Sequence, residues 1–377
     1  MAAKVEGQIG KESYRSHNNI IKCYCGYYNC ILVTDYLLMT FLYLDRSSCT
    51  PHLRFITSNS KVMSKKIIAV FGATGAQGGG LVRAIAADPS TEFMVRAVTR
   101  DPDSDKAKAL AALPHVEIVT GDLTNPDSVY KALEGAYGAY FVTFFWAHFS
   151  VEREIGEARL FADAAKQAGI KHAIWSTLED SRLMIPLEDD RMPTLQEKYK
   201  VPHFDGKGES DHFFTDTGVP TTFLYASFYW DNFIYFGAGP QRGEDGKLAL
   251  TLPIGDAKMA GIAAEDIGKC AYGVFKDPGK YIGEKVGVAG EQLTGNEMAA
   301  ALSTALGESV VYNKIPASVY RSFGFPGADD LGNMFQLYDE FATPLNQLRN
   351  VENSRSLNPE LLDFSQWLAR YSSLIPV

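Results

Sequence analysis

From residue 65 onward, short apolar runs alternate with segments whose apolar residues follow a helical period. The apolar runs predict six strands, over Lys66–Phe71, Met94–Thr99, Val116–Asp122, Ala139–Thr143, His172–Ser176 and Thr221–Tyr225. The segments between them predict helices over Leu81–Ala87, Asp105–Leu113, Val151–Ala168 and Glu209–Thr217, with another starting at Asn125-Pro126-Asp127. Strands that alternate with crossover helices pair in parallel, so the pattern predicts an α/β fold with a doubly wound parallel sheet.

The pattern loosens after residue 233, where glycine and proline interrupt shorter elements. Lys247 to Pro253 predicts a short hairpin, and Thr294-x-x-Glu297 is a capping box that opens a helix to Leu306. A strand at 310–312 and a helix near Ser318 follow. We therefore predict a cofactor-binding domain over 63–232 and a smaller α/β lobe over 233–377 that binds substrate or a partner.

The first 62 residues differ from the rest of the chain. Their apolar run, Ile31–Leu44, contains Asp35 and is shorter than the roughly 20 residues that a membrane span needs. Cysteines at 23, 25 and 30 lack the paired spacing and the nearby histidine of a zinc site, so no metal is expected. We interpret this segment as an atypical extension, either poorly structured or an artefact of the gene model.

The end of the first predicted strand carries the strongest functional signal. Gly72-Ala73-Thr74-Gly75-Ala76-Gln77-Gly78 joins that strand to the first predicted helix. A glycine at 72 permits the sharp turn, one at 75 lets a pyrophosphate approach the backbone, and one at 78 lets the helix pack on the sheet. A strand, a glycine turn and a helix in this order predict a dinucleotide site of Rossmann type.

Charge and cysteine content restrict the classes of partner. The formal net charge is −9, so the chain offers no basic surface for nucleic acid, and no membrane partner is expected. After residue 62 the only cysteine is Cys270, which excludes a disulfide-built body and favours a reducing compartment. The expected location is the cytoplasm, with the nucleus as a second compartment.

The residues that end the second and third strands indicate which dinucleotide is bound. Arg100 follows the second strand, where an acidic residue would select NAD, and its guanidinium favours the 2′-phosphate of NADP. Asp122 ends the third strand and is placed to meet the adenine edge. The alternatives are a solvated loop arginine and a turn or capping aspartate, so NADP(H) is the expected cofactor and NAD(H) the less favoured one.

Three residues are candidates for chemistry. Short-chain reductases pair Tyr-x-x-x-Lys on a helix with a serine that ends the fifth strand. Here Ser176 fills the strand position and Lys207 the lysine position, but His203 stands where the tyrosine should be. A histidine can donate a proton near neutral pH, so the residues are compatible with reductase activity. The other interpretation is a reductase whose activity is weakened or lost. The structural alternatives are an exposed helix-start lysine at 207 and a histidine without a chemical role at 203.

Four spaced motifs together resemble the NmrA-like family, an atypical branch of the short-chain dehydrogenases. They are 71–79, 98–100, 203–209 and 324–328, and the resemblance covers about 63–370. It implies cofactor contacts from Gly72, Ala73, Thr74, Gly75, Ala76, Gln77, Arg100, Asp122, Leu123, Val142, Thr143, Phe144, Lys207, Tyr229, Trp230, Asp231 and Asn232. One departure is acidic: Asp101, Asp103 and Asp105 follow the arginine and weaken the electrostatic attraction for a 2′-phosphate.

Two functions fit these residues. The first is an NADP(H) sensor or regulator with weak or no reductase activity, which the resemblance implies for part of the family. The alternative is an active NADPH-dependent reductase of quinones, enones or similar small carbonyls, with aromatic residues such as Phe144, Trp146 and Tyr229 lining an apolar pocket. Under the first hypothesis, the expected partners are a regulatory protein and a second copy of the chain in a homodimer.

Overall fold

The computed structural model describes residues 20–25, 28–35, 38–44, 56–57 and 65–377. The chain divides into two compact units, Met1–Ser64 and Lys65–Val377. In the first unit, four strands form an antiparallel sheet: β1 Ile20–Cys25, β2 Tyr28–Asp35, β3 Leu38–Leu44 and β4 Ile56–Thr57. The sequence predicted little regular structure here. These strands are what the structure describes of the segment, and its other residues lie outside the described ones.

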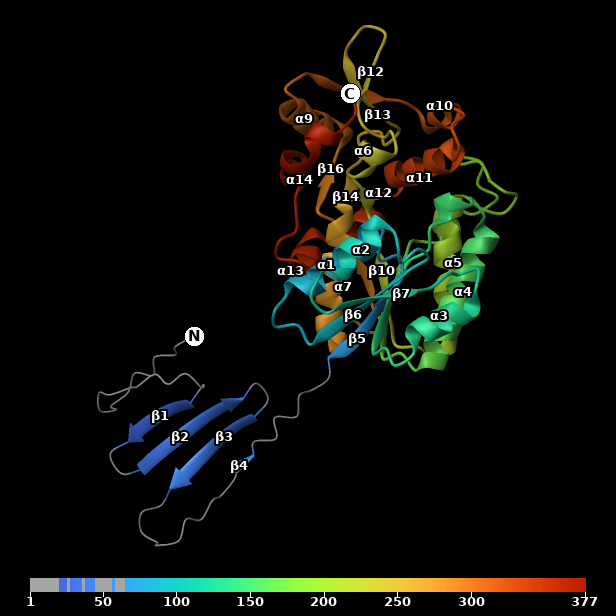
Figure 1. The fold of residues 1–377 in the computed structure, drawn as a ribbon. Helices are drawn as coiled ribbons and strands as arrows, with labels where there is room; N and C mark the ends of the chain where they lie inside the picture. The colour runs from blue at the N-terminus through green and yellow to red at the C-terminus, as the bar shows by residue number, and fades with distance from the viewer. Residues whose placement is uncertain (1–19, 26–27, 36–37, 45–55, 58–64) are drawn as a thin grey trace. The chain divides into compact units, whose positions relative to one another are not determined.

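A seven-stranded parallel sheet forms the centre of the second unit (Figure 1). Its order is β15-β10-β9-β8-β5-β6-β7, with β5 Lys66–Val70, β6 Phe93–Thr99, β7 Val116–Thr120, β8 Gly138–Phe141, β9 His172–Thr177, β10 Thr221–Tyr225 and β15 Lys285–Gly287. The strand order reverses between β5 and β8, and ligands of such sheets bind at the carboxyl ends around this point. The predicted α/β fold with a doubly wound parallel sheet is confirmed.

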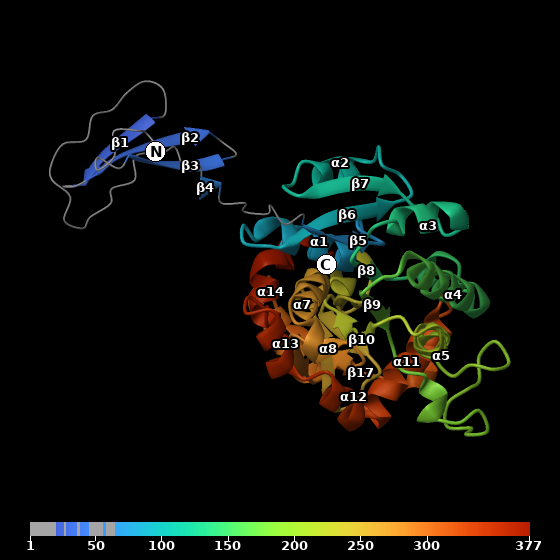
Figure 2. The ribbon, with the colours of Figure 1, turned by 90° about the horizontal axis from the view of Figure 1, so that it is seen from below.

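Helices cover both faces of this sheet (Figure 2). One face carries α1 Ala76–Ala87, α2 Asp105–Ala111 and α7 Ala264–Lys276, and the other carries α3 Pro126–Leu133, α4 Val151–Ala168 and α5 Pro202–Thr217. Helices α1 and α7 touch through glycine. A Cβ on Gly80 would lie 2.2 Å from the Glu265 carbonyl oxygen, and a Cβ on Gly268 would lie 2.2 Å from the Leu81 nitrogen. This close packing fixes the direction in which α1 leaves the glycine turn.

The C-terminal residues build a second core beside the sheet. Two three-stranded sheets, β11-β14-β16 and β12-β13-β17, comprise β11 Phe228–Tyr229, β12 Gln241–Arg242, β13 Leu248–Leu252, β14 Met259–Ile262, β16 Glu291–Leu293 and β17 Val310–Lys314. The helices are α6 Asn232–Tyr235, α8 Pro278–Tyr281, α9 Gly295–Leu306, α10 Ala317–Arg321, α11 Ala328–Glu340, α12 Ala342–Leu348, α13 Val351–Leu357 and α14 Phe364–Tyr371. The predicted hairpin range Lys247–Pro253 contains one strand, β13, whose hairpin partner β12 lies before that range, so the hairpin starts earlier than predicted. The capping box at Thr294 is confirmed. This region also supplies β15 and α7, so it shares the large sheet with residues 65–225.

The largest boundary difference concerns α5, which begins at Pro202 and not at Glu209. Proline at the first helical position has a suitable φ and lacks an N–H that would be unpaired there in any case. Glycines at 206 and 208 weakened the helical signal, but both are required by packing. A Cβ on Gly208 would lie 2.3 Å from the Asp180 nitrogen, and one on Gly206 would lie 3.0 Å from Val151. The longer helix places 203 and 207 on its first two turns.

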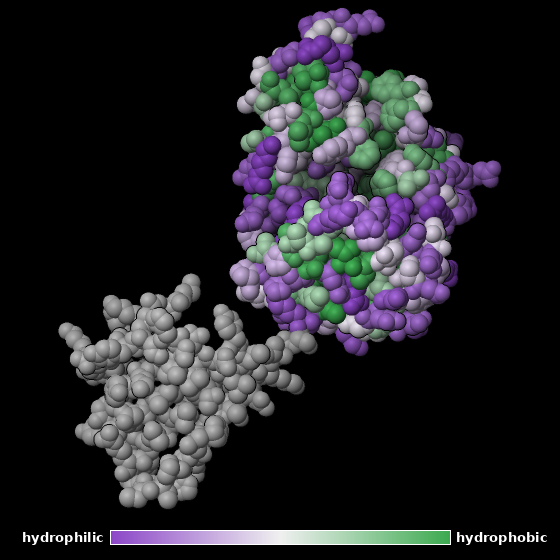
Figure 3. Space-filling model, viewed as in Figure 1, coloured by the Kyte–Doolittle hydropathy of each residue, from purple (hydrophilic) through white to green (hydrophobic). Residues whose placement is uncertain are grey.

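Apolar residues gather on the C-terminal part of the second unit's surface (Figure 3). The exposed aromatic side chains of this part include Tyr235, Phe236, Phe323 and Phe325. No helix in the described part of the chain is both long and apolar enough to cross a bilayer.

The partly buried carboxylate of Asp211 supports a pH-dependent prediction. It accepts hydrogen bonds from Trp175 Nε1 (3.0 Å), Thr177 Oγ1 (2.6 Å) and Tyr225 Oη (3.0 Å), and burial raises its pKa to about 6. The folded state therefore binds more protons than the unfolded state between about pH 4 and 6, so this group lowers stability as pH rises through that window. We expect Asp211→Asn to be more stable than wild type at pH 7 by about 2 kcal/mol but not at pH 4. Urea unfolding at both pH values tests this, and parallel pH slopes for the two proteins would contradict it.

Candidate functional site

The glycine turn lies between β5 and α1 and has the geometry of an anion cradle. Gly72 adopts a φ of +67°, and a Cβ there would lie 2.8 Å from Val142 Cγ1. Gly75 caps α1 without a side-chain hydrogen bond, and the first turn of α1 holds no acidic residue. A Cβ on Gly78 would lie 2.4 Å from the Gly72 carbonyl oxygen. Backbone N–H groups at the positive end of α1 are therefore open to phosphate, and these residues fit a dinucleotide.

The side chain of Gln77 ties this turn to three strand ends. Its Oε1 accepts hydrogen bonds from Ser176 Oγ (2.9 Å) and from the Tyr140 hydroxyl, and its Nε2 donates to the Tyr229 hydroxyl. Burial raises the pKa of Tyr229 to about 12 and raises that of Tyr140 as well, so both phenols stay protonated. Gln77 thus links the glycine turn to β8, β9 and β11 through its side chain. The sequence did not indicate this role.

Arg100 follows β6 and is exposed. Among the described residues no carboxylate lies within ion-pair distance of it, although three aspartates come next in the sequence. Asp101 instead accepts the Asp103 backbone N–H (3.0 Å), and Ser104 caps α2. The guanidinium is therefore available to a ligand at the carboxyl end of β6.

Asp122 and Leu123 form the turn after β7. The Asp122 carboxylate accepts hydrogen bonds from the Thr124 backbone N–H and hydroxyl, both at 2.9 Å, and these bonds lower its pKa. The turn explains why β7 ends at Thr120 and not at Asp122. Asp122 therefore has a structural role here, and its contact with an adenine edge stays a prediction.

Lys207 is buried and carries a buried counter-ion. Its Nζ lies 2.9 Å from Glu154 Oε1, donates to Thr143 Oγ1 (2.6 Å) and lies 5.1 Å from the centre of the Trp175 ring. Glu154 is fully buried in the first turn of α4. In sequence it resembles an ordinary acidic residue at a helix N-terminus, so its pairing with Lys207 could not be inferred without the relative placement of α4 and α5.

His203 lies four residues before Lys207 on α5 and is held by another buried carboxylate. Its Nδ1 is 2.6 Å from Asp330 Oδ1, and its backbone N–H donates to Asp330 Oδ2 (3.2 Å). The ring packs against Trp146 and Phe204, with both ring centres at 4.8 Å. His203 is therefore packed among aromatic rings, and it also forms a hydrogen-bonded pair with Asp330.

The structure does not bring Ser176 and Lys207 together. Neighbouring residues of a strand point to opposite faces of the sheet. Trp175 faces α5 and Lys207, whereas Ser176 faces α1 and bonds to Gln77. The groups of the short-chain reductase arrangement are thus separated across the sheet.

The other predicted cofactor residues occupy mixed environments. Phe144 follows β8 and is 57% exposed. Trp230 is 1% exposed and packs against Phe364 and Trp367 in the C-terminal core. Asp231 accepts the Ala264 backbone N–H (2.9 Å) at the start of α7, and burial raises its pKa; Asn232 begins α6. Packing gives Trp230 a structural role and its hydrogen bond to Ala264 gives Asp231 one, and their cofactor contacts stay predictions.

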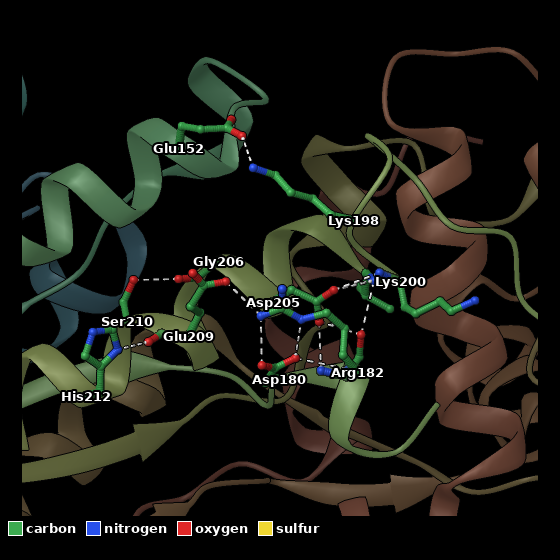
Figure 4. A network of polar contacts seen from close by, with 12 residues as sticks. Glu152, Asp180, Arg182, Lys198, Lys200, Asp205, Gly206, Glu209, Ser210 and His212 are labelled. Carbon is green, nitrogen blue, oxygen red and sulfur yellow. Dashed lines mark hydrogen bonds and ion pairs between the residues drawn. The ribbon is translucent and has the colours of Figure 1, made fainter. Parts of the chain in front are cut away.

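The segment before α5 is fixed by Asp205 (Figure 4). The carboxylate, which is fully buried, accepts hydrogen bonds from the Ser181 N–H (2.8 Å) and hydroxyl, and from the backbone N–H groups of Lys200 (2.8 Å) and Val201 (3.2 Å). Burial raises its pKa to about 6. These bonds join the loop after β9 to the N-terminus of α5, and so they position His203 and Lys207.

A cluster of His148, Glu154 and Glu157 adjoins Lys207, with its ligand-type atoms within 4.8 Å of one another. His148 Nδ1 accepts the Ser150 backbone N–H (3.1 Å), so the neutral ring carries its proton on Nε2. That Nε2 faces Glu154 Oε2 at 3.7 Å and Glu157 Oε2 at 3.9 Å. A metal would need the Nε2 lone pair, so this tautomer does not favour metal binding, and Nε2 lies beyond hydrogen-bond distance of both carboxylates.

Fold, glycine turn and strand order define a protein of the Rossmann-type dinucleotide-binding class. The model of the NmrA-like family matches residues 64–368, and the chain belongs to this family. It is 30% identical over 291 residues to the NmrA-like family domain-containing oxidoreductase FrzB of a Cladobotryum species, which covers 71% of this chain and 82% of that protein. It is 32% identical over 260 residues to the nitrogen metabolite repression protein nmrA of Emericella nidulans, covering 67% and 69%.

Solved structures of NmrA share the fold of this chain. The crystal structure of NmrA, a negative transcriptional regulator, superposes with a TM-score of 0.67 at 28% identity and covers 81% of this chain and 95% of that one. Structures of NmrA in complex with NAD and with NADP superpose with TM-scores of 0.67 and 0.66 at 27% identity. An NADPH-dependent quinone oxidoreductase of Escherichia coli, at 23% identity and a TM-score of 0.62, shares the fold.

Proposed function

We propose that this protein binds NADP(H) and acts as a redox sensor or regulator with weak or no reductase turnover. The observation that carries the proposal is the contrast within one site. The glycine turn is built for a pyrophosphate, whereas Ser176 faces away from Lys207 and histidine replaces the expected tyrosine. Relatives that bind NAD and NADP, one of them a transcriptional regulator, support it.

Sensing requires that the two occupancy states differ in conformation. The test is calorimetric titration of the full chain with NADPH, NADP+ and NADH, followed by limited proteolysis with and without each dinucleotide. Binding with an altered digestion pattern supports the sensor. Absence of NADPH binding refutes it, and binding with an unchanged pattern indicates a nucleotide-stabilised scaffold. A regulatory protein partner and a homodimer belong to the same proposal, and sizing of the protein in both states tests the dimer.

The preference for NADP(H) rests on Arg100. We expect Arg100→Ala to weaken NADPH binding about tenfold to a hundredfold because charge-assisted bonds to the 2′-phosphate are lost. NADH lacks this phosphate, so its affinity should not change. Arg83→Ala, which removes an exposed arginine paired with Glu265 (3.7 Å), is the matched control. Equal losses for NADPH and NADH would contradict the assignment.

A second candidate function is an NADPH-dependent reductase of quinones, enones or similar small carbonyls. It is favoured by the two turns of α5 on which His203 and Lys207 lie side by side, each held by a buried carboxylate. In this function bound NADPH would supply the hydride, Lys207 would hold the nicotinamide ribose, and His203 would supply a proton. NADPH oxidation across a carbonyl panel tests it. Background rates throughout, with Lys207→Ala changing only binding, would reject this function.

A further inference from the structure

Asp330 uses both oxygens of its carboxylate on a single residue. Oδ1 lies 2.6 Å from His203 Nδ1, and Oδ2 accepts the His203 backbone N–H at 3.2 Å. The two residues are 127 positions apart, and Asp330 is 4% exposed in the first turn of α11, where the helix dipole favours a carboxylate. Two bonds from one carboxylate fix the ring of His203 as well as its position.

The carboxylate also decides which ring nitrogen carries a proton. An ionised carboxylate only accepts, so Nδ1 must be the protonated nitrogen of the neutral ring. Nε2 has no hydrogen-bond partner among the described residues. It is not fully buried, so it retains contact with solvent. The Trp146 and Phe204 rings pack against the imidazole. Nε2 is therefore the nitrogen that can exchange a proton with a ligand.

We propose that Asp330 is a positioning residue, which holds His203 in the tautomer and orientation that present Nε2 to a carbonyl substrate. This inference rests on the second candidate function. In the proton-transfer step the Nε2–H bond of the imidazolium breaks as an O–H bond forms on the substrate oxygen. Bound NADPH would supply the hydride to the carbonyl carbon, so that the carbonyl would be reduced and the nicotinamide oxidised. The neutral imidazole keeps its Nδ1–H on Asp330, and solvent returns a proton to Nε2.

Asp330→Asn separates this role from simple packing. The buried backbone N–H of His203 still requires an acceptor, so the amide oxygen turns to it and the amide NH₂ faces Nδ1. Nδ1 then becomes an acceptor, and the proton of the neutral ring moves to Nε2. Asp329→Asn is the matched control, because Asp329 is the exposed neighbour on the same turn and does not touch His203.

The experiment is long-range ¹H–¹⁵N NMR of the full chain labelled with ¹⁵N-histidine, with His203→Gln to assign the signal, together with steady-state kinetics. We expect the Nδ1–H tautomer in wild type and Asp329→Asn, and the Nε2–H tautomer in Asp330→Asn. For Asp330→Asn, kcat should fall about a hundredfold while KM for NADPH is unchanged. A wild-type ring protonated at Nε2 overturns the proposal even if Asp330→Asn fails to fold, and so does an unchanged tautomer or an unchanged kcat in the folded variant.

Different outcomes refute the reductase function and the role of Asp330. The reductase function is refuted if the wild-type protein binds NADPH and shows the Nδ1–H tautomer but reduces no carbonyl. The pair of His203 and Asp330 then has a structural role only. Protein that reduces carbonyls but shows the Nε2–H tautomer keeps the function and refutes the role of Asp330.

Discussion

Gly78→Ala is expected to lower the affinity for NADPH at least a hundredfold, which is about 2.7 kcal/mol. The added Cβ would lie 2.4 Å from the Gly72 carbonyl oxygen and 2.8 Å from its carbon. Both are backbone atoms of the turn that we propose to bind the pyrophosphate, so no side-chain rotation relieves the overlap. The turn must open or α1 must shift, and either change removes the N–H groups from the phosphate. Calorimetric titration with NADPH measures the loss.

The matched control is Gly156→Ala in α4. This glycine is helical, and a Cβ there meets nothing within 4 Å. Alanine should stabilise the helix by about 1 kcal/mol and leave NADPH binding unchanged. If Gly78→Ala binds NADPH as wild type does, the turn is not the pyrophosphate site.

Glu154→Ala is expected to have the largest effect on stability. Its removal leaves the Lys207 ammonium buried without a counter-ion, since Thr143 offers only a neutral hydroxyl. Loss of one partner of a buried pair costs about 3–5 kcal/mol. Urea unfolding at pH 7 measures the difference, and Glu154→Ala within about 1 kcal/mol of wild type would be inconsistent with a buried ion pair.

Two further variants identify the cause of this loss. Glu157→Ala lies one turn later on α4, where Glu157 pairs with the half-exposed Arg153 (2.9 Å), and it should cost less than about 1 kcal/mol. The double variant Glu154→Ala, Lys207→Met removes both charges and should regain most of the stability lost by Glu154→Ala. A double variant as unstable as the single one would assign the effect to lost packing.

The fold could be predicted because its signals are local. The strands β5, β6 and β10 and the helix α4, which ends at Gly169, lie where the apolar runs and the stop signals placed them. The start of α5 was missed because Gly206 and Gly208 resemble helix breakers in sequence. Only the close approach of Val151 and Asp180 shows why these glycines are needed inside a helix.

Only the positions of some candidate site residues in the fold could be predicted. The glycine turn and Arg100 are contiguous with the elements that position them, so sequence order sufficed. The pairing of Glu154 with Lys207 and of Asp330 with His203 could not be predicted. A carboxylate in the first turn of a helix is common because it interacts favourably with the helix dipole, so neither residue stands out in the sequence. The direction of Ser176 was equally hidden: β9 is buried on both faces, so no alternation of polar and apolar residues marks which side chains point to α5.

The seventh strand has a consequence for how the chain folds. β15 pairs with β10 along Phe223–Tyr225, although some sixty positions separate them in sequence, and Gly287 is so closely approached that a Cβ would lie 2.4 Å from the Leu348 carbonyl oxygen. During synthesis β10 therefore presents an unpaired, apolar edge until residues 285–287 have emerged. Such an edge is prone to pair with other chains, and closing so long a loop is slow. A fragment ending near residue 232 retains the whole glycine turn but should aggregate rather than fold.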